Sequence, residues 1–165
     1  MLRIGHGYDV HRFAPSNAPE RDLMLGGVCI PSALSLLAHS DGDVLIHALC
    51  DGILGAIGAG DIGQHFPDTD PRFKNISSSA LLTQVLNLAN DDGWQLVNVD
   101  VTVIAQVPTL SPYRQSMREN LATLLGTDTA RVNIKATTTE KLGFVGRKEG
   151  IACHAVVLLA GADAR

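Results

Sequence analysis

The sequence predicts an α+β fold in which helices pack on one face of a mixed β-sheet. Three observations lead to it: segments with strand-like patterns, segments with helical periodicity, and the order in which they follow one another. That order is strands, helix, helix, strand, helix, strand, strand, which differs from the regular alternation of a doubly wound fold. At 165 residues, we expect one domain that spans residues 1–165.

The first elements are two strands and a helix. An apolar strand is expected over residues 2–8, and a short one over 23–28 is weakened by its Gly-Gly pair. The first helix begins at Ser40 or Asp41, both good N-cap residues, and runs to about residue 59. Its apolar side chains cover nearly every face, so it is buried either in the core or in a subunit interface.

The later elements are two helices and three strands. A loop rich in Asp, Gly and Pro precedes the second helix, which covers residues 80–90 behind a cap of three serines. Ser111-Pro112 opens the third helix and Gly126 closes it. A glycine-rich loop separates the last two strands. The expected strands are residues 96–105, 132–138 and 151–159.

Composition narrows the function classes. The net charge of −4 lacks the basic excess of a nucleic-acid-binding surface, so we expect no nucleic-acid partner. The longest apolar segment, residues 44–59, contains His47 and Asp51 and is too short for a membrane span. The N-terminus lacks a signal-peptide pattern, so we expect a cytoplasmic location. Three scattered cysteines do not indicate a disulfide framework.

Three side chains in the first third of the chain are candidate metal ligands. Asp9 and His11 are two residues apart in an extended segment, so they point to the same side. His47 lies in an apolar helix, where an unpartnered imidazole is costly. One carboxylate and two imidazoles suit zinc with one position left open. Alternatively, His47 is a core histidine bonded to a carbonyl, Asp9 forms an Asx turn, and His11 is at the surface. Asp43, one turn before His47, could orient it or pair with a cation.

Two further groups carry possible phosphate chemistry. His39 precedes a helix start, where free N–H groups attract anions, although a solvent-facing histidine fits as well. Residues 135–147 end a strand in three threonines, followed by Glu140, glycines and cations, which suits phosphate oxygens and Mg²⁺. The alternative is an exposed turn. The pattern is not a Walker loop. Asp61 could line a pocket, whereas Asp70 is interpreted as a turn residue.

Several motifs together resemble one family, the 2-C-methyl-D-erythritol 2,4-cyclodiphosphate synthases. They are residues 5–11, 37–43, 60–63, 66–70 and 135–150. The resemblance implies conversion of 4-diphosphocytidyl-2-C-methyl-D-erythritol 2-phosphate to the cyclic diphosphate, with release of CMP, in the non-mevalonate isoprenoid pathway. It also implies a homotrimer with active sites between subunits, which agrees with an apolar first helix at an interface.

The resemblance assigns roles to individual residues. Asp9, His11 and His47 match zinc ligands, and Glu140 matches the ligand of a second cation, Mg²⁺ or Mn²⁺. His39 and Thr138 match the residues that polarise the reacting phosphates. Residues 105–111 with 136–138 match the cytidine pocket. The substrate-binding positions it implies are Ser40, Asp61, Gly63, Asp68, Ala105, Leu110, Ala136, Thr137, Thr138, Phe144 and Arg147.

The chain also departs from the family pattern. Thr109 stands where relatives often carry Lys beside the cytidine pocket. Some relatives hold a prenyl diphosphate in a cavity on the trimer axis through residues that match Arg147 and Glu149. His154 stands near where some relatives have an acidic residue, which bears on that cavity.

Two other functions are compatible with these residues. A metal-dependent phosphohydrolase would use the same ligands with a metal-bound water as nucleophile. A non-catalytic trimeric module would bind nucleotide or prenyl diphosphate without turnover, but a binder does not need an open-sided metal site.

Overall fold

The computed structural model describes residues 1–18, 21–38, 40–67, 69–73 and 75–161. Its strands are β1 (Leu2–Arg12), β2 (Leu23–Leu25), β3 (Val28–Ile30), β4 (Trp94–Ile104), β5 (Val132–Thr137) and β6 (Gly150–Gly161). Its α-helices are α1 (Val44–Ile57), α2 (Ile62–His65), α3 (Ser78–Asp91), α4 (Arg114–Leu124) and α5 (Gly143–Gly146). Single 3₁₀ turns lie at Pro71–Phe73, Ser111–Tyr113 and Thr129–Arg131.

Within the described residues the main sheet has four strands in the order β1-β6-β4-β5. The first two pairings are antiparallel and β4 pairs with β5 in parallel, so the sheet is mixed. β2 and β3 form a separate hairpin. The predicted α+β class with a mixed sheet is therefore confirmed.

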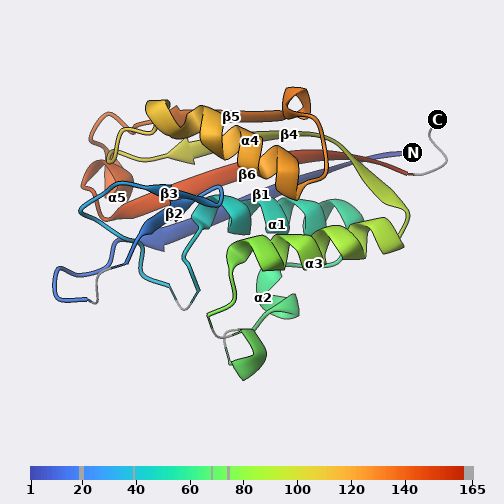
Figure 1. The fold of residues 1–165 in the computed structure, drawn as a ribbon, viewed down its shortest axis with the longest axis horizontal. Coiled ribbons are helices and arrows are strands. Elements are labelled where there is room, and N and C mark those ends of the chain that lie inside the picture. The colour runs from blue at the N-terminus through green and yellow to red at the C-terminus, as the bar shows by residue number, and fades with distance from the viewer. Residues whose placement is uncertain (19–20, 39, 68, 74, 162–165) are drawn as a thin grey trace.

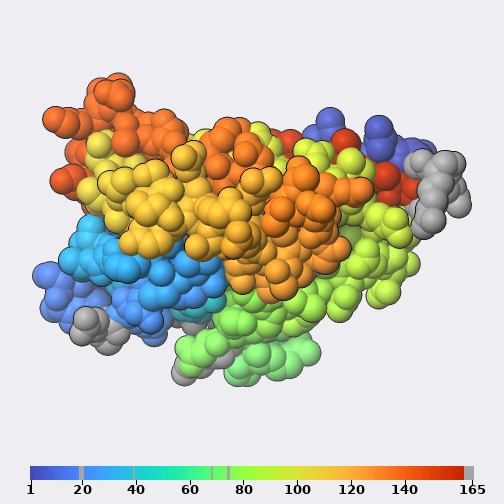
Figure 2. All heavy atoms as spheres, turned by 45° about the horizontal axis from the view of Figure 1, so that its top comes forward, coloured from blue at the N-terminus to red at the C-terminus, as the bar shows by residue number. Residues whose placement is uncertain are grey.

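The long helices cover one face of the sheet (Figure 1). α1 packs on β1 and β6, α4 packs on β5, and α3 packs on α1 and β4. Figure 2 shows α4 on this side of the molecule, next to both the β2–β3 region and α3. Strand residues facing the helices are buried, whereas no described element covers the other face, which exposes Leu2, Ile4, Tyr8, Val10 and Val156.

Helix α1 belongs to the core. Its apolar side chains are almost all inaccessible to solvent, because the sheet covers one side of the helix and α3 another. This confirms the core alternative, and the expectation that α1 supplies a subunit interface is wrong. Five exposed large apolar side chains lie instead on the uncovered sheet face.

Glycines set the boundaries that the sequence misplaced. The expected strand over 23–28 is a hairpin, because Gly26 and Gly27 adopt positive φ and turn the chain. Gly42 also has a positive φ of 73°, which is not helical, so α1 begins after it, at Val44, and not at the expected Ser40 or Asp41. Two expected loops contain single helical turns, α2 and α5. No helix in the described ranges is both long enough and apolar enough to span a bilayer.

Candidate metal centre and substrate cavities

Close packing of α1 on β1 brings the candidate metal ligands together. A side-chain Cβ at Gly7 would lie 1.8 Å from the Ala48 carbonyl oxygen, and one at Gly5 would lie 1.8 Å from the carbonyl oxygen of Gly52. The two glycines therefore let the helix backbone lie directly on the strand. Asp9 and His11 follow on the same face of β1 and reach the His47 side chain of α1.

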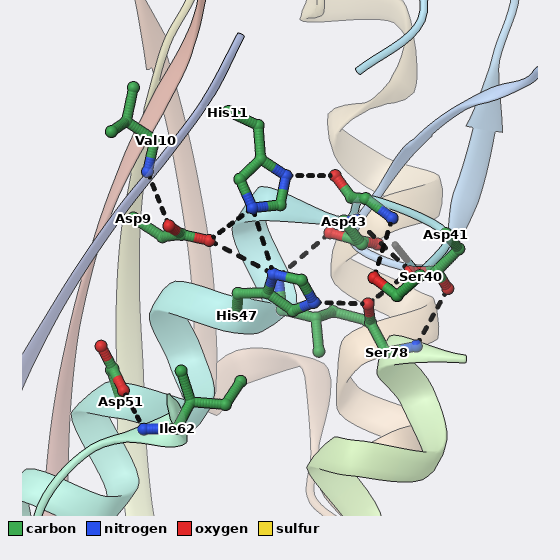
Figure 3. A network of polar contacts seen from close by, with 12 residues as sticks. Asp9, Val10, His11, Ser40, Asp41, Asp43, His47, Asp51, Ile62 and Ser78 are labelled. Carbon is green, nitrogen blue, oxygen red and sulfur yellow. Dashed lines mark hydrogen bonds and ion pairs between the residues drawn. The ribbon is translucent and has the colours of Figure 1, made fainter. Parts of the chain in front are cut away.

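Asp9, His11 and His47 form a compact cluster (Figure 3). Asp9 Oδ2 lies 3.0 Å from His11 Nε2 and 3.2 Å from His47 Nδ1. The two ring nitrogens are 3.3 Å apart. The side chains are only 27%, 15% and 13% exposed, so the cluster is largely shielded from water. These three ligand atoms are placed so that one metal ion could contact all of them.

The charges in the cluster shift its protonation. Burial alone would raise the pKa of the Asp9 carboxyl, but hydrogen bonds from His11 and His47 hold that pKa well below its ordinary value. Burial also opposes the charged form of His11, yet its contact with Asp9 raises the pKa of the imidazole. A carboxylate that stays ionised can bind a cation. The Asp9 carboxylate favours a proton on His11, and a bound metal would displace that proton.

His11 has a second partner that fixes its ring. Its Nδ1 lies 3.0 Å from the Gly42 carbonyl oxygen. A carbonyl oxygen accepts hydrogen bonds and cannot donate them, so Nδ1 carries the proton and Nε2 is left for a metal. Metal-binding histidines usually have such a partner on the nitrogen that does not bind the metal. The residues present therefore fit a zinc-like ion.

Asp43 fixes the loop that supplies the Gly42 carbonyl. Its fully buried carboxylate accepts N–H bonds from Gly26 at 3.0 Å, Gly27 at 2.6 Å and Ile46 at 3.0 Å. It caps α1 and ties the β2–β3 turn to the helix start. Burial raises the pKa of this carboxyl. Within the described residues its carboxylate bonds neither the His47 ring nor a cation, so both roles expected for the Asp43 side chain are wrong; only its backbone carbonyl reaches His47, by accepting the His47 N–H at 3.0 Å.

The metal-ligand cluster opens into a cavity of about 840 Å³. Two predicted substrate residues, Ser40 and Gly63, line it, together with the apolar Ile62 and Phe66. Asp61 is exposed and caps α2 by accepting the Gln64 N–H at 3.0 Å. The remaining two predicted residues of this region, His39 and Asp68, lie outside the described residues.

A second cavity of about 300 Å³ is lined by predicted cytidine-pocket residues. It lies where β4 and β5 end, and Thr109 and Arg114 also line it. The predicted residues in its wall are Ala105, Leu110, Ala136, Thr137 and Thr138. The two cavities share no lining residue, and they lie by β1 and β5, which are the opposite edges of the sheet.

The other predicted residues lie on the exposed turn between β5 and β6. Glu140 has a φ of 52°, and its N–H lies 3.3 Å from Thr138 Oγ1. Phe144 is 38% exposed on α5. Arg147 Nε donates to Glu149 Oε1 at 2.7 Å. None of these three side chains lines either cavity.

Sequence reasoning missed two residues beside His47. Ser78 is fully buried at the start of α3, and its hydroxyl lies 2.9 Å from His47 Nε2. Asp41 bonds both the hydroxyl and the N–H of Ser78. The sequence interpretation treated Asp41 and the Ser77-Ser78-Ser79 run as helix caps. Of these, only Ser77 caps its helix, by accepting the Ala80 N–H.

Comparison with known proteins gives a consistent result over nearly the whole chain. The model of the YgbB family matches residues 2–160. A 2-C-methyl-D-erythritol 2,4-cyclodiphosphate synthase of Syntrophotalea carbinolica is 62% identical over 159 residues, which are 96% of this chain and 94% of that protein. The structure of IspF from Plasmodium falciparum with CDP has a TM-score of 0.85 at 39% identity and covers 98% of this chain and 97% of that one. The bifunctional IspDF of Campylobacter jejuni gives 0.91 at 49% identity, covering 98% of this chain and 42% of that longer one.

Proposed function

The chain belongs to the YgbB family, and from this premise we propose that it is a cyclodiphosphate synthase of the non-mevalonate isoprenoid pathway. Its substrate is 4-diphosphocytidyl-2-C-methyl-D-erythritol 2-phosphate. The 2-phosphate oxygen attacks the β-phosphorus, the bond from that phosphorus to the α-phosphate oxygen breaks, and CMP leaves with the electron pair. The reaction is that of a phosphorus–oxygen lyase.

The observation that carries this proposal is the Asp9, His11 and His47 cluster at the wall of a large cavity, in a chain of this family. The three residues would hold Zn²⁺ with a position open to a phosphate oxygen. Bound there, the ion supplies positive charge that lowers the repulsion between the two reacting phosphates. The attacking phosphate is already ionised, so the chain needs to position it rather than activate it with a strong base.

A second cation, Mg²⁺ or Mn²⁺, is proposed at Glu140. The exposed turn leaves this carboxylate free to meet a cation that arrives with the diphosphate, as Mg²⁺ usually does. Thr138 and His39 are proposed to bond the reacting phosphates, and Ser40, Asp61, Gly63 and Asp68 to bind the erythritol portion and its phosphate. Ser40 and Gly63 line the same cavity as the metal-ligand cluster, and this position supports their proposed role in substrate binding.

The cavity at the ends of β4 and β5 is proposed as the cytidine pocket. It is shaped by small side chains, Ala105 and Ala136, which leave room for a base. Phe144 and Arg147 are proposed to act from the neighbouring turn. We also propose that Arg147 and Glu149 bind a prenyl diphosphate and that the protein is cytoplasmic. Both proposals rest on the family resemblance.

We also propose a homotrimer with active sites between subunits. The sheet face without helices exposes five large apolar side chains, a surface typical of an interface. The two cavities lie at opposite sheet edges and share no residue, although the substrate must contact both. Pairing the β1 edge of one copy with the β5 edge of the next would join them.

The purified protein with the cytidyl substrate, with and without a chelator, tests the function. We expect CMP and the cyclic diphosphate, and loss of both with chelator. Repeating the reaction in ¹⁸O-water separates this activity from phosphohydrolysis. Label in CMP or in a linear phosphate product, measured by mass spectrometry, would contradict the cyclase and favour the hydrolase.

A further inference from the structure

A chain of three side chains leads from His47 of the metal-ligand cluster to the buried Ser78 and the half-buried Asp41 (Figure 3). His47 Nε2, the ring nitrogen that faces away from Asp9, lies 2.9 Å from Ser78 Oγ. The Ser78 hydroxyl also bonds Asp41 Oδ1, and Asp41 Oδ2 accepts the Ser78 N–H at 3.0 Å. Ser78 is fully buried, so water does not compete for its hydroxyl.

The directions of these hydrogen bonds follow from proton counting. An ionised carboxylate only accepts, so the one proton of the Ser78 hydroxyl is donated to Asp41. Ser78 Oγ can then only accept from His47, and His47 Nε2 must carry a proton. The other ring nitrogen, Nδ1, lies 3.2 Å from Asp9 Oδ2 and donates to that carboxylate when no metal is bound, so Nδ1 is the nitrogen at which a metal would displace a proton.

We propose that Ser78 and Asp41 are positioning residues that keep His47 protonated at Nε2, so that Nδ1 is the nitrogen directed at the proposed zinc. The inference rests on the proposed metal site and extends it beyond the three ligands. His11 is fixed in the same manner by the Gly42 carbonyl. Asp41 and Gly42 are consecutive, so one loop before α1 orients both imidazoles.

The position of Ser78 couples this role to the docking of α3. Asp41 holds both the backbone and the side chain of Ser78, and the hydroxyl therefore has little freedom to turn away from His47. Ser77 is the matched control. It is exposed, its hydroxyl accepts the Ala80 N–H at the same helix end, and it makes no hydrogen bond to His47.

The test compares Ser78→Ala with Ser77→Ala in the full-length protein. The first readout is the protonation of His47 Nε2 in zinc-free protein, from long-range ¹H–¹⁵N spectra of histidine-labelled samples. The second is zinc affinity by competition with a chromophoric chelator. We expect wild type and Ser77→Ala to show His47 protonated at Nε2 and to bind zinc with equal affinity. Ser78→Ala should lose part of the Nε2 protonation, because only the Nδ1–H bond to Asp9 then remains, and should weaken zinc binding by about 10–100-fold, the usual effect of losing such a partner.

Asp41→Asn provides a second variant should Ser78→Ala fail to fold. Its amide can donate as well as accept, so it permits the reverse hydroxyl orientation, and we expect a partial loss of the proton on His47 Nε2. Unchanged Nε2 protonation with unchanged zinc affinity in the folded variants would overturn the inference. Wild-type protein that binds no zinc would instead overturn the proposed metal site, and Nε2 protonation in the zinc-free protein would still report on the positioning role.

Discussion

The candidate zinc ligands and the candidate magnesium ligand lie in contrasting surroundings. Asp9, His11 and His47 come from two elements far apart in sequence, are largely buried, and contact one another. Glu140 stands on an exposed turn, where its N–H bonds Thr138 two residues earlier. The contrast indicates that the first site has its shape before any ligand arrives, whereas the second is completed by the substrate phosphates.

The largest effect is expected where the first region depends on backbone contact. Gly7→Ala would place a methyl group 1.8 Å from the Ala48 carbonyl oxygen, so strand and helix would have to separate. We expect destabilisation of about 3 kcal/mol or more, since backbone cannot give way as a side chain can. Denaturant unfolding measures it.

Gly55→Ala is the control for this substitution. Gly55 lies in α1, the helix that packs on Gly7, is exposed, and has nothing within 4 Å of an added Cβ. It should gain about 0.5–1 kcal/mol from helix propensity. Equal stability of Gly7→Ala and wild type would show that close packing of α1 on β1 does not determine the site.

The next effect separates the two cation sites directly. His11→Ala removes one of three ligands, and we expect zinc affinity to fall by more than the roughly 100-fold caused by losing an outer partner. kcat/KM should fall by about 10³-fold or more, because the metal supplies several kcal/mol of charge stabilisation. Zinc content by atomic spectroscopy and steady-state kinetics check both values. Full zinc occupancy in the purified variant would refute the ligand assignment.

Glu140→Gln addresses the second region. Loss of one charged ligand, worth about 1.5–3 kcal/mol, should raise the Mg²⁺ concentration for half-maximal activity by about 10–100-fold. Zinc content should not change, because Glu140 is not one of the three residues of the candidate zinc site. A Mg²⁺ titration of the initial rate measures the shift. An unchanged titration would mean that the exposed turn holds no cation.

The same contrast explains how far the sequence could predict the site. Asp9 and His11 share a face because of strand alternation, which is a local property, and His47 was conspicuous in an apolar helix. Ser78 and Asp41 escaped notice because their contact joins residues 37 positions apart and depends on how α3 docks.

Element boundaries show the same limit. The class and order of the elements follow from periodicity, which each segment carries by itself. The start of α1 could not be located as well, because its N-cap Asp43 is held by Gly26 and Gly27 of a distant hairpin. The uncovered sheet face could not be predicted either. Alternation along a strand shows that two sets of side chains point to opposite faces, but it does not show which face the helices cover.

The smallest effect is expected at Thr109, beside the second cavity. Thr109 is exposed at its wall, in a position where a longer cationic side chain could reach a phosphate of the bound nucleotide. An exposed charge pair contributes about 0.2–1 kcal/mol, so Thr109→Lys should tighten CDP binding by at most about fivefold. Calorimetric titration in low and high salt measures it, and Thr109→Gln, similar in length but uncharged, is the control. The gain should vanish at high salt, since screening weakens exposed pairs. If Thr109→Gln tightens CDP binding equally, the effect comes from packing and not from charge. A much larger gain that does not depend on salt would mean that the pocket is shielded from solvent, as expected if a second copy of the chain covers it.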